Sequence, residues 1–258
     1  MIEISPKGRG SAWRSGHMQR AAIASVIGGL VAIYAPAANA QDVYKPTGTR
    51  IGQARQTADP DFARRMLKTT AACVSRLDSA GVVALLRGDS HAALNYAAAG
   101  IQNEDDHSPL ELSQCLTEAM NGSQVVMEMR IPPRALRTVL AEEAYLKRHS
   151  APLEIAAGSP RVLVGRAVIG GETAAQSQAL GIFADCLVFN APNEADRLVR
   201  GPVGGTTERD NARALSASIS QCITAGQQAN FSTSAIRDIV ADGLWARSEF
   251  DAARVAGE

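Results

Sequence analysis

The chain has few aromatic residues and no cluster of basic ones. Aromatic residues make up only 4% of its 258 residues, whereas sheets are enriched in them. Basic and acidic residues number 26 each, and no run of Lys and Arg occurs. The sequence therefore gives no basis for binding nucleic acid or an anionic membrane. Scarce aromatics and abundant Ala together favour closely packed helices.

Long apolar runs are also missing. The longest uncharged one, residues 21–35, is too short to span a bilayer. It ends in Ala-Pro-Ala-Ala-Asn-Ala, which places small side chains at Ala38 and Ala40, as signal peptidase requires. The sequence therefore predicts a Sec signal peptide over 1–40, cleavage after Ala40 and a periplasmic or secreted product. The basic side chains that precede the run are Lys7, Arg9, Arg14 and Arg20.

Translation from Met1 or from Met18 gives the same mature chain, which starts at Gln41. No Cys follows the apolar run and no adjacent Arg pair precedes it, so neither a lipid anchor nor twin-arginine export is indicated. Removing 1–40 takes away four basic residues and one acidic residue. The remaining 218 residues carry 22 basic and 25 acidic side chains, a net charge near −3. We expect no membrane insertion after processing.

Cysteines are few but regularly placed. Fifteen residues after the first and third cysteines stand Gly88 and Gly201, each preceded by Arg. The second and fourth cysteines each follow Ser-Gln. All of them lie in the mature chain, at Cys73, Cys115, Cys186 and Cys222.

A further stretch matches without a gap. Residues 135–142 read Ala-Leu-Arg-Thr-Val-Leu-Ala-Glu, and residues 235–242 read Ala-Ile-Arg-Asp-Ile-Val-Ala-Asp. An aromatic follows at the same distance in each, Tyr145 and Trp245. Several matches in the same order predict an internal duplication. The expected parts of the mature chain are a flexible segment 41–59, helical unit 60–149, linker 150–172, helical unit 173–250 and tail 251–258.

Two matched cysteine pairs in an exported chain predict disulfides rather than reactive thiols or metal ligands. Four cysteines allow three connectivities. We favour Cys73–Cys115 and Cys186–Cys222, because each copy then carries its own bridge. Pairing between the copies is also compatible with a two-fold arrangement. A bridge closing a loop of about forty residues would stabilise the fold by roughly 4 kcal/mol.

Apolar spacing predicts a mainly α fold, with two duplicated disulfide-stapled helical units packed as one domain or two small ones. Asp59-Pro60-Asp61 is typical of a helix start. Residues 124–130 and 161–169 are compatible with strands. The positions expected on helical apolar faces are Phe62, Met66, Cys73 and Leu77, then Leu215, Ile219, Cys222 and Ile223, and finally Leu136, Val139 and Leu140 with their counterparts Ile236, Ile239 and Val240.

Six side chains retained at matched positions are candidates for a surface or interface. In a functional interpretation, each Arg and its acid line a groove between the copies that binds a peptide or polar ligand. In a structural interpretation, which we favour, they form a solvated face or an ion pair between the copies, and the aromatic closes the core. The six are Arg137, Glu142, Tyr145, Arg237, Asp242 and Trp245.

No catalytic constellation stands out. Gly88-Asp89-Ser90 resembles the opening of one esterase block, but the second copy has no serine there and no histidine follows His149. Glu104 and Asp106 belong to an acidic run without the spacing of a calcium loop. Neither a metal site nor a cofactor is indicated. We predict a protein without enzymatic activity; the alternative is a hydrolase using Ser90, Glu104 or Asp106.

The signal, the paired cysteines and the matched helix resemble those of uncharacterised secreted bacterial proteins with duplicated paired-Cys helical repeats. That resemblance implies no activity. We expect a periplasmic interaction or structural protein whose partner is another envelope protein or a peptide. The alternatives are a periplasmic hydrolase and a small-ligand-binding protein that uses the groove between the repeats.

Overall fold

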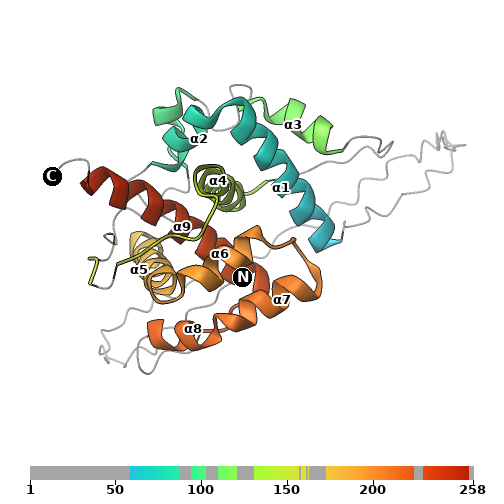
Figure 1. Cartoon of the computed structure of the whole chain (residues 1–258). Coiled ribbons are helices and arrows are strands. Elements are labelled where there is room, and N and C mark those ends of the chain that lie inside the picture. The colour runs from blue at the N-terminus through green and yellow to red at the C-terminus, as the bar shows by residue number, and fades with distance from the viewer. Residues whose placement is uncertain are drawn as a thin grey trace, which may run out of the picture. The chain divides into compact units, whose positions relative to one another are not determined.

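The structure is a computed structural model of the whole chain (Figure 1). The described residues belong to one compact unit. They contain helices and no strand, so the predicted mainly α fold is confirmed. Residues 124–130 and 161–169 lie outside the described part, except Val162, which is not in a strand. The structure describes residues 59–87, 94–102, 110–120, 131–156, 158–160, 162, 173–223 and 229–255.

The first segment begins at the predicted helix start. The side chain of Asp59 accepts a hydrogen bond from the Asp61 amide, and Pro60 occupies the first turn, where its missing amide costs nothing. Asp78 ends this helix and starts the next by accepting from the Gly81 amide at 2.8 Å. The elements are α1 Pro60–Leu77, α2 Ser79–Leu86, the 3-10 helix η1 Ala97–Ala99, α3 Leu112–Ala119 and α4 Pro133–Arg148.

Among the described residues, the second segment has a similar order with one more α-helix than the first. Thr173 caps its first helix by accepting from the Gln176 amide, and Pro192 opens the next helix. Ser232 caps the last helix, because its hydroxyl oxygen accepts a hydrogen bond from the Ala235 amide. The helices are α5 Ala174–Asn190, α6 Pro192–Arg200, α7 Gly205–Ala214, α8 Ser216–Cys222 and α9 Thr233–Val255.

Both disulfides lie within their segments, as favoured from the sequence. Cys73 in α1 is bonded to Cys115 in α3, and Cys186 in α5 is bonded to Cys222 in α8. Each bridge therefore joins the first helix of its segment to a short helix near the surface. No bridge connects the two segments.

The crossing of α4 and α9 is the most extensive helix contact in the described part and forms the centre of the unit. α1 and α2 pack on α4, whereas α5, α6 and α7 pack on α9 (Figure 1). Every residue from Ile239 to Glu249 in α9 is buried. One hydrophobic core contains side chains of both segments, among them Leu140 of α4 and Leu244 of α9. The described segments thus share one core.

The apolar face predicted for α1 is only partly buried. Met66 and Cys73, in the middle turns, are buried, but Phe62 and Leu77 are 38% and 42% exposed. Both exposed residues lie in the terminal turns of the helix. Periodicity alone overestimated the face because it marks which side of a helix is apolar, not how far along its length a neighbour covers it.

None of the described helices is by itself both long and apolar enough to cross a bilayer. α1 and α2 meet that test only as a pair, and they are bent by 112° where they join.

The outer helices approach the centre differently in the two segments. Lys68 of α1 forms an ion pair with Glu143 of α4 at 3.1 Å. Lys68 stands as far before Cys73 as Gly181 stands before Cys186. Glu143 stands as far after Arg137 as Gly243 stands after Arg237. The matched residues of the second segment are therefore Gly181 and Gly243. A Cβ atom at Gly243 would lie 2.9 Å from the backbone oxygen of Ala184 in α5. The backbones of α5 and α9 therefore approach each other closely, whereas α1 and α4 are joined by an ion pair between charged side chains.

Gly243→Ala tests this close approach. We expect the substitution to destabilise the protein by about 1–3 kcal/mol, because the new methyl group meets a backbone atom that cannot rotate away. Urea unfolding followed by circular dichroism measures the change. At an uncrowded helical site the same substitution stabilises by about 1 kcal/mol, so increased stability would contradict the close approach.

Candidate functional site

The six side chains singled out in the sequence are all buried on α4 and α9. They therefore do not form a solvated face, and that part of the expectation is wrong. The reason is that both helices present these positions to each other and to the helices packed on them. Their exposed fractions are 1% for Arg137, 4% for Glu142, 0% for Tyr145, 3% for Arg237, 0% for Asp242 and 1% for Trp245.

The charged members form ion pairs between the helices. Arg137 Nε donates to Asp242 Oδ1 at 2.7 Å. Arg237 donates through Nε and Nη2 to the two carboxylate oxygens of Glu142, both at 2.8 Å. Each arginine thus pairs with the acid at the matched position of the opposite helix. Such reciprocity is typical of a two-fold interface.

Each arginine also binds the end of a helix in its own segment. Arg137 Nη1 donates to the Leu86 carbonyl at the end of α2, at 3.2 Å. Arg237 Nη2 donates to the Val199 carbonyl in the last turn of α6 at 2.8 Å, and to the Gly201 carbonyl beyond it at 3.0 Å. A guanidinium group satisfies helix-end carbonyls and complements the negative end of the helix dipole. One side chain therefore connects three helices.

Burial makes this arrangement sensitive to loss of a partner. It raises the pKa of Asp242, and Arg137 opposes that shift by favouring the carboxylate. Removing one member of a buried pair leaves an uncompensated charge in a medium of low polarity. The pairs are therefore structural groups, with no access for a ligand.

The two matched aromatics have different partners. Tyr145 donates to Asp196 of α6 at 2.7 Å, and burial followed by the hydrogen bond from this phenol to Asp196 raises its pKa. Trp245 lies edge-on to Phe250, and the guanidinium carbon of Arg137 lies 5.6 Å from its ring centre. Both aromatics close the core.

An ionic seam formed by Arg64, Lys68, Glu142, Glu143 and Glu208 runs beside the crossing. Arg64 Nη1 donates to Glu208 of α7 at 2.9 Å, and Lys68 binds both Glu142 and Glu143. Burial raises the pKa of Glu143. The seam attaches α1 to α4 and to α7, so it connects the two segments a second time.

Asp238 of α9 lies next to this seam and is partly buried. Its Oδ1 accepts from the hydroxyl of Thr138, the residue at the matched position of α4, at 3.4 Å. Burial raises the pKa of Asp238 from 3.8 to about 6, although Arg64 and Arg134 oppose the shift. This carboxyl group therefore titrates close to neutral pH.

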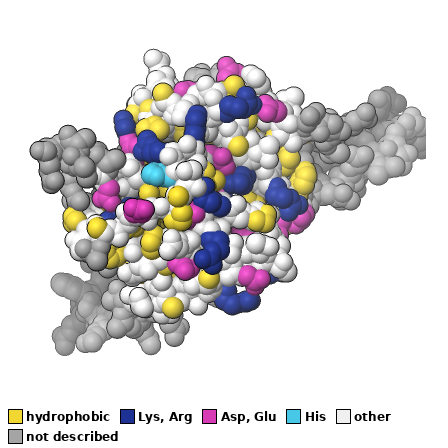
Figure 2. Space-filling view, viewed as in Figure 1, with side chains coloured by type: hydrophobic (Ala, Val, Ile, Leu, Met, Phe, Trp, Pro, Cys, Tyr) yellow, Lys and Arg dark blue, Asp and Glu magenta, His cyan; other side chains and the backbone are white. Residues whose placement is uncertain are grey.

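Exposed cations collect where α2, α4 and α6 end. We call this surface the basic patch and define it by Arg87, Lys147, Arg148 and Arg200. Figure 2 shows a histidine beside dark blue Lys and Arg side chains on this face of the molecule. Arg87 and Arg148 are 59% and 41% exposed, and both bind Glu249 of α9.

Arg200 links the end of α6 to His149, the residue that follows α4. Arg200 Nε donates to Asp196 Oδ2, and its Nη2 donates to the His149 carbonyl, both at 2.7 Å. Burial lowers the pKa of His149, and the positive charges of Arg148 and Arg200 lower it further. Glu249 and Asp196 form ion pairs with three of the four cations, and the fourth, Lys147, donates to the Ser75 carbonyl.

The basic patch was not predicted from the sequence. Lys147-Arg148-His149 was a local signal, but Arg87 and Arg200 come from other helices. Only folding brings them to the same surface.

The candidate hydrolase residues Ser90, Glu104 and Asp106 lie outside the described residues. Within the described ranges, no group of three or more His, Cys, Asp or Glu side chains is arranged to hold a metal ion. Comparison with known protein families, curated proteins and solved structures gives no match.

The buried pair between the helices is tested by Arg137→Ala. We expect a loss of about 3–5 kcal/mol in unfolding free energy, because Asp242 stays buried without its partner. Arg76→Ala is the control: Arg76 and Glu118 form an ion pair that is 58% and 53% exposed, and such a pair contributes at most about 1 kcal/mol. Similar losses in both variants, measured by urea unfolding without reductant, would contradict this assignment.

Asp238→Asn tests the shifted carboxyl group. Because the folded-state pKa is raised, the contribution of this group to stability is greatest below about pH 4 and falls as the pH rises through 6. The variant should lack this fall and gain about 3 kcal/mol at pH 7. Unfolding free energies at pH 4, 5, 6 and 7 measure it. Asp210→Asn, at a carboxylate that is 67% exposed, should leave the profile unchanged; an unchanged profile in Asp238→Asn would disprove the shift.

Proposed function

We propose that the chain is an exported, non-enzymatic binding protein of the periplasm, built from two duplicated units. The predicted signal peptide over 1–40 and the two disulfides support this location, because disulfides persist in oxidising compartments. The reciprocal pairing of α4 and α9 supports the duplication, because two copies of one unit meet most readily through a two-fold interface.

The observation that carries the binding function is the basic patch. After removal of 1–40 the chain has a net charge near −3, yet four exposed cations gather at one place. Such a local potential attracts a partner of opposite charge and orients its approach. The proposed partner is an acidic segment of an envelope protein or an acidic peptide.

The patch is also held in place before a partner arrives. Glu249 fixes Arg87 and Arg148, and Asp196 together with the His149 carbonyl fixes Arg200. Lys147 donates to the Ser75 carbonyl at 2.9 Å. Since these side chains are already ordered, binding costs less conformational entropy than it would for free surface lysines.

A labelled polyglutamate peptide tests the proposed surface. The mature protein, recovered from periplasm with Gln41 at its N-terminus, should bind the peptide, and added NaCl should weaken the complex. Arg148→Gln and Arg200→Gln should each raise the Kd about fivefold, the equivalent of about 1 kcal/mol.

The control for this experiment is Arg213→Gln on α7, which removes an exposed arginine outside the patch. Circular dichroism establishes that each variant is folded. Absence of binding, or an equal loss in the control, would disprove the patch as the binding surface. Recovery of the chain from the cytoplasm with residues 1–40 intact would disprove the location.

A further inference from the structure

The two disulfides differ in the protection of their sulfur atoms. Cys73 and Cys115 are 4% and 0% exposed. Cys186 is also only 4% exposed, but its partner Cys222, the last residue of α8, is partly exposed. Of the four cysteines, Cys222 is the one that is partly exposed rather than buried.

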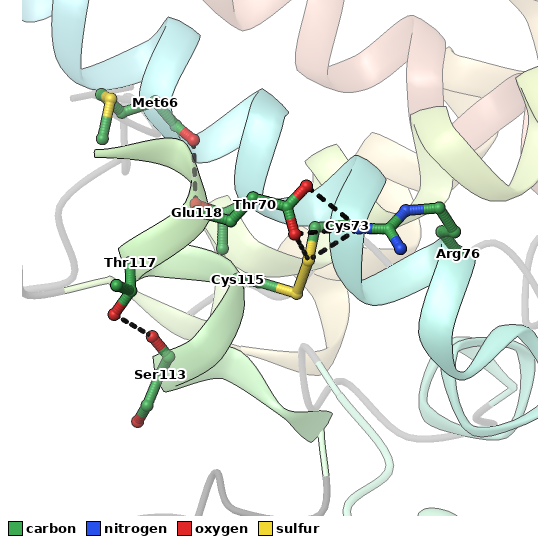
Figure 3. The surroundings of a disulfide bond; sticks show 8 residues. All are labelled: Met66, Thr70, Cys73, Arg76, Ser113, Cys115, Thr117 and Glu118. Carbon is green, nitrogen blue, oxygen red and sulfur yellow. Dashed lines mark hydrogen bonds and ion pairs between the residues drawn. A yellow bond between two sulfur atoms is a disulfide. The ribbon is translucent and has the colours of Figure 1, made fainter. Parts of the chain in front are cut away.

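Charge adds to the protection of the first disulfide. The ion pair of Arg76 with Glu118 lies beside the Cys73 sulfur, and Figure 3 shows both side chains pointing toward it. A Glu118 carboxylate oxygen is 3.4 Å from Cys73 Sγ, and Arg76 Nη2 is 3.6 Å from it. The attacking species in disulfide exchange is a thiolate, and of the two charged groups the carboxylate, which repels it, lies closer to the sulfur than the guanidinium, which attracts it.

The second disulfide has an amide donor where the first has an ion pair. Asn190 Nδ2 lies 3.5 Å from Cys186 Sγ and 3.4 Å from Cys222 Sγ. An amide donor stabilises a departing thiolate and does not repel an approaching one. The sequence carries no second carboxylate at the place of Glu118, because the matched position in the second segment is Ala225.

We infer that Cys186–Cys222 is a thiol–disulfide exchange site for an external dithiol, whereas Cys73–Cys115 is a permanent structural bridge. A thiolate of the dithiol attacks Cys222 Sγ and forms a mixed disulfide. The bond between the protein sulfurs breaks, and its electron pair leaves on Cys186 Sγ, next to the Asn190 amide. The second thiolate of the dithiol then resolves the mixed disulfide and releases Cys222. The dithiol loses two electrons and the protein gains them, and protons from solvent neutralise the two thiolates.

The surrounding structure limits the consequence to α8. This helix contains no buried residue, whereas α3 buries Leu112 and Cys115 and packs broadly on α1. Opening the second bridge therefore removes the covalent link between α8 and α5, and α5 stays in place through its contact with α9. This inference is independent of the basic patch and of the partner proposed for it.

Reduction of the oxidised mature protein by dithiothreitol under native conditions tests the inference. Aliquots are alkylated at successive times, and peptide mass spectrometry identifies the modified cysteines. We expect Cys186 and Cys222 to be labelled at least tenfold faster than Cys73 and Cys115. Equal rates, the reverse order, or rates for both bridges that follow global unfolding in low urea would overturn the inference.

Two matched variants separate charge from simple exposure. Glu118→Gln, at an exposed position, should speed reduction of Cys73–Cys115 severalfold. Asn190→Asp, also exposed, places a carboxylate beside the second bridge and should slow its reduction severalfold. If neither rate changes while the wild-type order holds, charge plays no part in the difference and that step of the inference is wrong.

Discussion

The buried charge pairing between α4 and α9 is the constraint on which the rest of the structure depends. Arg137 and Arg237 each reach an acid on the opposite helix and carbonyl groups at the end of a third helix. Hydrophobic burial alone would tolerate sliding or rotation of the two helices. Directional hydrogen bonds from a planar guanidinium group select one register, because any other leaves a charge buried without a partner. The outer helices are then positioned relative to this crossing.

Around that crossing the two segments differ in ways that local packing explains. Where the first segment has Lys68 and Glu143 between its helices, the second has Gly181 and Gly243 and a close backbone approach. The charged residues at the α4–α9 crossing are of the same charge type in both segments, because each of them pairs with a residue of the opposite segment. A substitution at the crossing therefore disturbs contacts in both segments. A change in an outer contact disturbs only one, which allows one side to be charged and the other closely packed.

Two surface features follow from the same arrangement. Helices that end together bring cations to their carbonyl ends, where the helix dipole favours positive charge, and the shared carboxylate of Glu249 holds Arg87 next to Arg148. The short helices that carry Cys115 and Cys222 pack to different extents on the first helix of their segments. The two disulfides, although of the same chemical kind, therefore differ in how far their cysteines are exposed to solvent. The proposed binding site and the proposed exchange site lie on separate parts of the surface.

The sequence by itself determined the helical class and the start of α1 at Pro60, because caps and apolar spacing act over short distances along the chain. It favoured one pairing of the cysteines through the repeated order of motifs, and the tertiary structure decided that pairing. The sequence also singled out Arg137 and Asp242 as important, but a repeated pattern does not tell whether a charge faces solvent or a second helix. Only the tertiary structure decided that both are buried partners, and only folding gathered the basic patch. Both depend on contacts between residues about 50 to 160 positions apart, and no local pattern encodes such distances.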